Sequence, residues 1–237
     1  MIAGTCGVIT GLIDILFVGS PTDSKLRDMV DNQANKITEK FASFLGWDKE
    51  KAIEKGKNTT ASAIGYLEKK FKVNYDHATT HSTGGAVDNL SLKNHHLKSL
   101  GHSPDLIGLF FSVLNQFTNT SSFISNGQLI TIDTDTFELK GGNFIAKIFC
   151  GVANWFGHIM SDWAGSSGTI GQGGRGTGVP IPFYNLFQII NVGEFGQHKQ
   201  TFATITSKVF ENGYDLRHGI AMAIPVVINE LLIRLMY

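Results

Sequence analysis

The sequence has few charged residues and no excess of either sign. Only 17% of its 237 residues are Asp, Glu, Lys or Arg, against about a quarter in an average soluble domain. Lys plus Arg and Asp plus Glu number 20 each. Because nucleic-acid binding through phosphates needs a basic field, this balance argues against a nucleic-acid partner. The low charge predicts that much of the chain is buried in protein or lies against lipid.

Cysteine is scarce as well. Cys6 and Cys150 both lie in apolar runs, which favours buried free thiols, although a disulfide is left open. Neither has a neighbouring base in the sequence, and no serine nucleophile elbow occurs, so covalent catalysis is unsupported. Gly171 to Gly176 fits the letters of a dinucleotide-binding pattern. A helix is expected before it and a proline-aromatic segment follows, where that fold needs a strand and then a helix.

The two ends of the chain are apolar, but neither reads as a clean membrane span. Residues 1–18 lack a basic leader region and carry Asp14, so we do not expect a secretion signal. Residues 219–237 are interrupted by Glu230 and Arg234, and a charge near mid-bilayer costs about 2.5–3.5 kcal/mol on insertion scales. The expected location is the cytoplasm or the inner face of the cell membrane, and a membrane surface is left open as a partner.

Helical periodicity dominates the rest of the chain. Helices are expected at 24–45, 48–71 (weak at 56–60), 87–100, 106–117, 143–164, 181–192, 199–212 and 214–236. Gln128–Asp133 and Thr136–Leu139 flank a polar turn and predict a hairpin at about 128–139. The expected fold is therefore mainly α: a multi-helix bundle with one small β-hairpin insertion. It forms a single domain, 1–237, in which 23–72 is a candidate peripheral helical hairpin.

The start of the 106–117 helix has its own signal. Ser103 precedes Pro104 and Asp105. These residue types predict a capping hydroxyl, a proline at the first helical position and a carboxylate that interacts with the helix dipole. Asp105 is accordingly assigned to capping rather than to ligation.

The most informative feature is the pair His158 and Asp162, four residues apart in the apolar stretch 143–164. That spacing places an imidazole and a carboxylate on one helical face. The same stripe is otherwise small or polar and includes Asn154 and Ser161. A solvent-facing stripe would carry long charged side chains. An enclosed polar site is therefore predicted, and a divalent metal is its simplest occupant.

Five of the eight histidines fall between residues 77 and 102. His102 directly precedes a helix, and His95 and His96 lie about two turns upstream. Adjacent histidines on a helix point in different directions, so at most one of that pair is expected to share a site with His102. The remaining histidines are interpreted as ordinary surface or loop residues: His77, His81, His198 and His218.

Three patches resemble YdjM-like membrane-bound metal-dependent hydrolases. Asn94-His-His-Leu-Lys-Ser-Leu-Gly-His-Ser103 resembles that family's first histidine motif, with one more residue between histidines and no arginine. Gly157-His-Ile-Met-Ser-Asp162, with Val179-Pro-Ile-Pro-Phe183 beyond a glycine loop, is similar to its second motif. Gly11-Leu-Ile-Asp14 is similar to an early segment of the family but lacks its proline. Zinc-dependent phospholipase C, an all-α enzyme, is distantly similar.

The resemblance implies a metal site. Its ligands would be Asp14, His95 or His96, His102, His158 and Asp162, with Asp14, His102 and Asp162 as the catalytic candidates. Imidazole and carboxylate suit zinc, with manganese or iron as alternatives, and such an ion activates water. Asn94, Asn154 and Ser161 are candidates to orient the ligands.

These residues predict a hydrolase of phosphoester bonds. The substrate would be a phosphoester or a lipid-like molecule, and Asn154 and Arg175, the one charge of the glycine loop at 165–178, are the candidate substrate-binding residues. The alternative is a non-enzymatic helical protein that associates with a membrane or a partner and uses its histidines as hydrogen bonders. For Asp14 an equal alternative is a helix end that reaches water. The oligomeric state does not follow from the sequence.

Overall fold

The computed structural model describes residues 2–71, 86–87, 90, 94–134, 139–165 and 177–236. Two antiparallel strands are the only β elements among them. The helices are α1 (Ile2–Ile13), α2 (Lys25–Phe44), α3 (Lys49–Glu54), α4 (Thr59–Lys70), α5 (His95–Lys98), α6 (Leu106–Thr118), α7 (Phe144–Asp162), α8 (Tyr184–Ile189), α9 (Phe202–Glu211) and α10 (Leu216–Met236). The expected mainly α fold with one small hairpin is confirmed.

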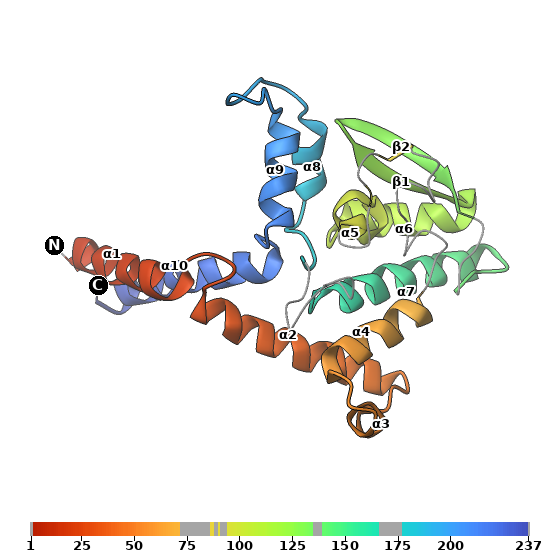
Figure 1. The fold of residues 1–237 in the computed structure, drawn as a ribbon, viewed down its shortest axis with the longest axis horizontal. Helices are drawn as coiled ribbons and strands as arrows, with labels where there is room; N and C mark the ends of the chain where they lie inside the picture. The colour runs from red at the N-terminus through yellow and green to blue at the C-terminus, as the bar shows by residue number, and fades with distance from the viewer. Residues whose placement is uncertain are drawn as a thin grey trace.

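The body of the molecule is built on α7. This helix packs against α6 on one side and against α4 on another, and α4 in turn packs on α2 (Figure 1). Ala42, Ala63, Leu67 and Phe71 form the core between α2 and α4. The small side chains of Ala42 and Ala63 at this contact let the axes of α2 and α4 approach closely.

The hairpin lies earlier in the chain than expected. Strand β2 (Gln128–Asp133) coincides with the first predicted strand, but its partner is β1 (Thr120–Ser125), which precedes it. Asn126 and Gly127 form the turn, both with positive φ, as two-residue hairpin turns require. The prediction for Thr136–Leu139 was wrong at Leu139, which lies in a bend, and the rest lies outside the described residues.

Most predicted helices are present, but two are much shorter. Among the described residues of the stretch expected at 87–100, only those of α5 are α-helical; a 3₁₀ turn, Leu100–His102, follows, and Val87 is not helical. The stretch expected at 181–192 is helical only over α8. The stretch 181–192 is mostly apolar and has few polar positions to show where periodicity ends. In both stretches, tertiary contacts set the boundaries of the helix.

The start of α6 differs in detail from the prediction. Asp105, rather than Ser103, is the N-cap: its Oδ1 accepts hydrogen bonds from the backbone of Ile107 and Gly108. Ser103 donates its hydroxyl proton to Asp105 Oδ2, which also accepts from the backbone N–H of Phe183. Asp105 therefore joins α6 to the segment before α8, and its assignment to capping is confirmed.

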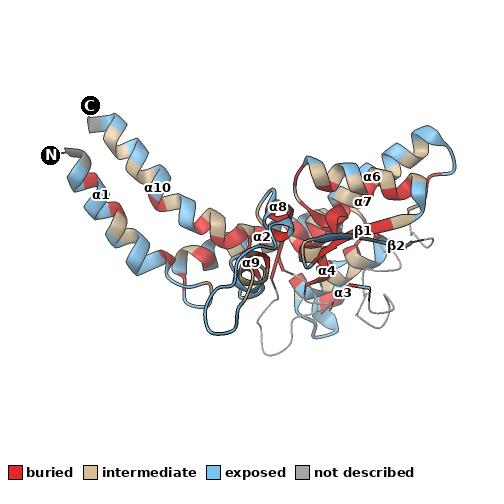
Figure 2. Cartoon of the chain, turned by 90° about the horizontal axis from the view of Figure 1, so that it is seen from above, coloured by how far each residue is buried: buried red, intermediate tan, exposed pale blue. Residues whose placement is uncertain are grey.

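Helices α1 and α10 leave the body together. They lie side by side as an extension whose outer end carries both ends of the chain (Figures 1 and 2). A short π-helical segment, Asp14–Val18, continues α1 towards α2. We call α1, this π-helical segment and α10 the apolar arm. Figure 2 shows that much of the arm's surface is exposed or half-buried.

The two cysteines are free thiols. Cys6, on the arm, is buried, as expected. Cys150, on α7, is only half-buried, so the expectation of a buried thiol was wrong for this residue.

Candidate metal centre

Helix α7 turns its small and polar side chains inward. Gly151, Asn154, His158, Ser161 and Asp162 are all buried, whereas several large apolar residues of its first half are exposed. A Cβ at Gly151 would lie 2.6 Å from Cα of Val113 in α6. The close approach of the neighbouring helices therefore requires the small stripe. The predicted enclosed polar face is confirmed, and the apolar positions point outward instead.

The second side of the site comes from α5 and the turn that follows it. His95 and His96 begin this one-turn helix, and the 3₁₀ turn brings His102 back beside them. Leu97 and Leu100 are 1% and 3% exposed and anchor the segment in the body. Ser99 pairs with Phe123 of β1 through an isolated bridge, which fixes the turn against the hairpin.

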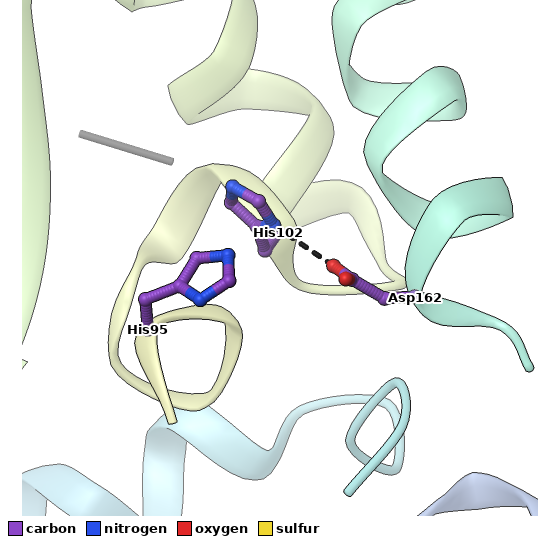
Figure 3. Close-up of side chains that lie close together, drawn as sticks. All are labelled: His95, His102 and Asp162. Atoms are coloured by element: carbon purple, nitrogen blue, oxygen red, sulfur yellow. Dashed lines mark hydrogen bonds and ion pairs between the residues drawn. The ribbon is translucent and has the colours of Figure 1, made fainter. Parts of the chain in front are cut away.

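The two sides meet at His95, His102 and Asp162. One ligand atom of each lies within 4.8 Å of the others, and all three residues are buried. Nδ1 of His102 is 3.0 Å from Oδ2 of Asp162. Figure 3 shows the rings of His95 and His102 on one side and the carboxylate at the end of α7 on the other. Of the adjacent pair, His95 is the residue that converges with His102 and Asp162.

His158 and His96 flank this group. The ring centroid of His158 lies 4.1 Å from that of His102, and the ring of His96 meets that of His95 edge to face at 5.4 Å. Neither is among the three residues whose ligand atoms converge. We call His95, His96, His102, His158 and Asp162 the histidine cluster; each of them is at most 5% exposed.

The electrostatics of the cluster favour a negative Asp162. Burial by itself raises the pKa of this carboxyl, but the hydrogen bond with His102 and the fields of the three nearby histidines lower it further, so the net pKa lies well below the usual range. Burial lowers the pKa of His96, with the charge of Asp162 opposing the shift. Asp162 is also the last residue of α7, where the helix dipole repels an anion and attracts a cation. A cation at this point would therefore be held by both the carboxylate and the helix end.

His96 adds a chemical clue. Both of its ring nitrogens are buried without a hydrogen-bond partner, although the backbone of Gly178 lies near enough to affect its pKa. A buried polar atom left unpaired is costly, so such atoms are uncommon except where a function requires them. The donor set of imidazoles and one carboxylate fits zinc and its neighbours in the first transition row.

Not all of the predicted site residues lie here. Asp14 is exposed on the apolar arm, where α1 ends, and is not part of the converging group. The structure agrees with the alternative expectation for Asp14, a position at a helix end that reaches water. Arg175 lies outside the described residues, as does most of the glycine loop.

The residues expected to orient the ligands have other hydrogen bonds. The amide of Asn154 donates to the backbone oxygen of Leu139, and that of Asn94 donates to Glu211 in α9. The hydroxyl of Ser161 donates to the backbone oxygen of His158, within its own helix. These contacts hold the helices that carry the cluster.

Of the histidines interpreted as ordinary, His198 is exposed as expected. His218 is 1% exposed, so its interpretation as a surface residue was wrong. It lies in the first turn of α10, where its ring contacts Tyr214 edge to face. His77 and His81 lie outside the described residues.

A buried ionic network, which was not expected from the sequence, lies near the histidine cluster. Asp215 is fully buried and pairs with both Arg27 of α2 and Arg217 of α10, at 3.0 and 2.6 Å. Burial raises the pKa of Asp215, but the two guanidinium charges outweigh it and the net pKa is lowered. Arg217 also donates to the backbone oxygen of Ala164, just beyond α7. The available signal was the pair of charged residues Asp215 and Arg217, followed by His218, at the start of an apolar helix.

A polar cleft lies on the other side of α5. Its volume is about 230 Å³, and its walls come from α5, the hairpin, α8 and α9. Lys98 and Lys208 place two amines there, and Gln188 contributes a buried amide. Asn94, which also lines the cleft, directly precedes His95. The cleft is therefore separated from the histidine cluster by a single helical turn.

Comparison with known proteins gives no relative for this arrangement. No family model matches the sequence, and no curated protein or solved structure matches it.

Proposed function

We propose that this protein is a metal-dependent hydrolase of phosphoester bonds. The convergence of His95, His102 and Asp162 within 4.8 Å in a buried site carries the proposal. These three residues would hold a divalent ion, zinc in the first instance. The ion, when bound, supplies a Lewis acid that lowers the pKa of a coordinated water.

The other cluster residues would support that ion. The ring of His158 packs on the ring of His102 and limits its rotation. His96 lies beside His95 and is held neutral by burial, so it adds a second basic nitrogen near the site without adding charge. Residues in such positions tune affinity by fixing ligand orientation.

The choice of a phosphoester rests on charge. Lys98 and Lys208 bring two amines to the cleft beside α5, although Glu211 also lines it. Ammonium groups are suited to bind phosphate oxygens as point charges. Each residue of the histidine cluster is at most 5% exposed, so hydrolysis of a phosphoester would require the surrounding chain to open. Metal binding does not require a bound substrate and is therefore tested first.

The direct test is the metal content of protein purified without a histidine tag. Near-stoichiometric metal is expected in the wild-type chain, with loss in His102→Ala and in Asp162→Asn. His198→Ala is the matched control, since His198 is an exposed histidine outside the cluster. Wild-type protein without bound metal, or metal unaffected by both cluster substitutions, would contradict the proposal.

Catalysis is tested separately with the metal-loaded chain. Bis-p-nitrophenyl phosphate and p-nitrophenyl phosphate report diester and monoester hydrolysis. Activity that follows metal content across the variants supports a hydrolase. A stable metal complex that cleaves neither ester would leave the ion with a structural role, and the non-enzymatic alternative would then be preferred.

A further inference from the structure

The apolar arm exposes large hydrophobic side chains along its length. On α10, Met222, Val226, Val227, Leu231 and Leu235 are 49–82% exposed. Residues 216–235 are long and apolar enough to cross a membrane, by length and composition, yet only 22% of the most apolar window is buried. A core helix of a soluble protein would pass the same test but would be mostly buried. The apolar surface of α10 is therefore not covered by its own chain.

The distribution of these side chains indicates what covers them. At 100° per residue, the five exposed positions of α10 spread over roughly 220° of the helix circumference. Val8 and Leu12 on α1 and Phe17 on the π-helical segment are also exposed. A second copy of the arm would cover one side of each helix. A lipid bilayer surrounds both helices and covers every side.

Polar groups inside the arm have partners within it. The hydroxyl of Thr10 hydrogen-bonds the backbone oxygen of Cys6 and lies 3.4 Å from Oδ1 of Asn229 on α10. Arg234 makes an ion pair with Glu230 at 3.0 Å. In hydrocarbon, where water is absent, polar groups must be satisfied internally. The arm meets this requirement at its middle and at its outer part. The exposed Asp14 lies at the inner end of the arm, close enough to His218 in the first turn of α10 for their charges to interact, where the arm leaves the body.

The charged residues of α10 lie towards its two ends. Glu230, about 20 Å along the helix from Arg217, forms an ion pair with Arg234. Arg217, at the inner end of α10, belongs to the buried ionic network of the body. No charged residue lies between it and Glu230. At 1.5 Å per residue, Arg234 is about 26 Å further along the helix. A hydrocarbon core is about 30 Å thick, so the long side chain of Arg234 would reach the far headgroups.

We propose that the apolar arm inserts into a phospholipid bilayer as a pair of antiparallel helices, while the body with the histidine cluster stays at the membrane surface. The network of Arg27, Arg217 and Asp215 marks the level at which the arm leaves the body. This inference is independent of the metal, since the arm contains none of the three converging residues.

The experiment has two parts, the first being alkaline carbonate extraction of membranes from cells that express the full chain. The wild type remains in the pellet, and Val226→Lys with Leu231→Lys moves at least half of the protein to the supernatant. Both side chains are more than half exposed, at 67% and 54%, so the substitutions disturb little of the packing between the two helices. Phe44→Lys with Ile53→Lys, two exposed apolar residues of the body, is the matched control and stays in the pellet.

The second part does not depend on a destabilising variant. A fluorophore is attached to Met222→Cys in a chain that also carries Cys6→Ser and Cys150→Ser. The labelled protein is reconstituted in phosphatidylethanolamine–phosphatidylglycerol vesicles. Quenching by lipids spin-labelled along the acyl chain is expected, and the same fluorophore on Ile53→Cys is not quenched.

Equal quenching at the two positions, or none at Met222→Cys, overturns the proposal. So does a wild-type chain that is extracted by carbonate and has the mass of a dimer that the lysine variant converts to monomer. That result would assign the arm to a second copy. Metal content is measured in the same preparations. Failure of the membrane proposal would leave the metal content unchanged, whereas failure of the hydrolase proposal would appear as an absence of bound metal.

Discussion

Nδ1 of His102 lies 3.0 Å from Oδ2 of Asp162, across 60 residues of sequence. The histidine comes from a turn and the carboxylate from the end of a long helix. Removing a carboxylate from water costs several kcal/mol unless a positive charge or several hydrogen bonds compensate it. The pair therefore locates the point in the body where a cation would contribute most.

The cluster residues should differ in their effects on metal affinity. We expect His95→Ala and His102→Ala to abolish near-stoichiometric binding, because each removes a ligand. His96→Gln should weaken binding about 10–100-fold, as loss of a supporting residue does. Asp14→Asn should have no effect, because Asp14 is exposed on the arm. Competition with a chromogenic chelator measures all four variants, and an Asp14→Asn defect equal to that of His95→Ala would contradict this site.

Asp215 should be a major source of stability. Asp215→Asn leaves the two buried guanidinium groups with the half-buried Asp31 as their remaining carboxylate. Breaking a buried pair completely typically costs about 3–5 kcal/mol, so a loss towards the lower end of that range is expected. Because the folded pKa of Asp215 is lowered, its contribution is present above the unfolded value of about 3.9 and is lost as pH falls through the folded value. Urea unfolding at pH 7 and pH 3 measures both effects. The substitution should cost clearly less at pH 3; an equal cost at both would refute this account.

Tyr184 should make the protein sensitive to alkali. Burial raises the pKa of its hydroxyl to about 12, against the hydrogen bonds with Ser207 and Gln188. The folded state thus holds its proton more tightly than the unfolded state does. The resulting stability is fully present below about pH 10 and is lost as pH rises towards 12. Tyr184→Phe should flatten thermal stability against pH over this range, and a variant with the same pH profile as the wild type would contradict the prediction.

Gly151 should be essential to the packing of α7 on α6. Its Cβ would meet Cα of Val113 at 2.6 Å, so Gly151→Ala must push the two helices apart, and overpacking of this kind costs about 1–3 kcal/mol. Gly65→Ala, in α4, is the control, because nothing lies within 4 Å of the added Cβ. There the higher helix propensity of alanine should stabilise by up to about 1 kcal/mol. Denaturant midpoints compare the two, and equal midpoints would refute the prediction.

Local signals in the sequence were sufficient to predict most helices. Ser24 was expected to begin a helix and is the N-cap of α2, and the weak stretch at 56–60 separates α3 from α4. Hydrophobic periodicity and caps report interactions between residues one to four positions apart. The hairpin required a pairing partner, and local signals indicated Thr136–Leu139; the hydrogen-bond ladder instead pairs Gln128–Asp133 with the preceding segment Thr120–Ser125.

The sequence by itself determined the chemistry available to this protein. His158 and Asp162 share a helical face because four residues make about one turn, and the same rule marks the small stripe of α7. Only the tertiary structure decided which groups meet. It placed His95 and His102 against Asp162, sent Asp14 to the arm and buried Asp215 between two arginines. Contacts between residues far apart in the sequence depend on how the helices pack. Local sequence patterns reflect only interactions between residues a few positions apart, so they do not predict that packing.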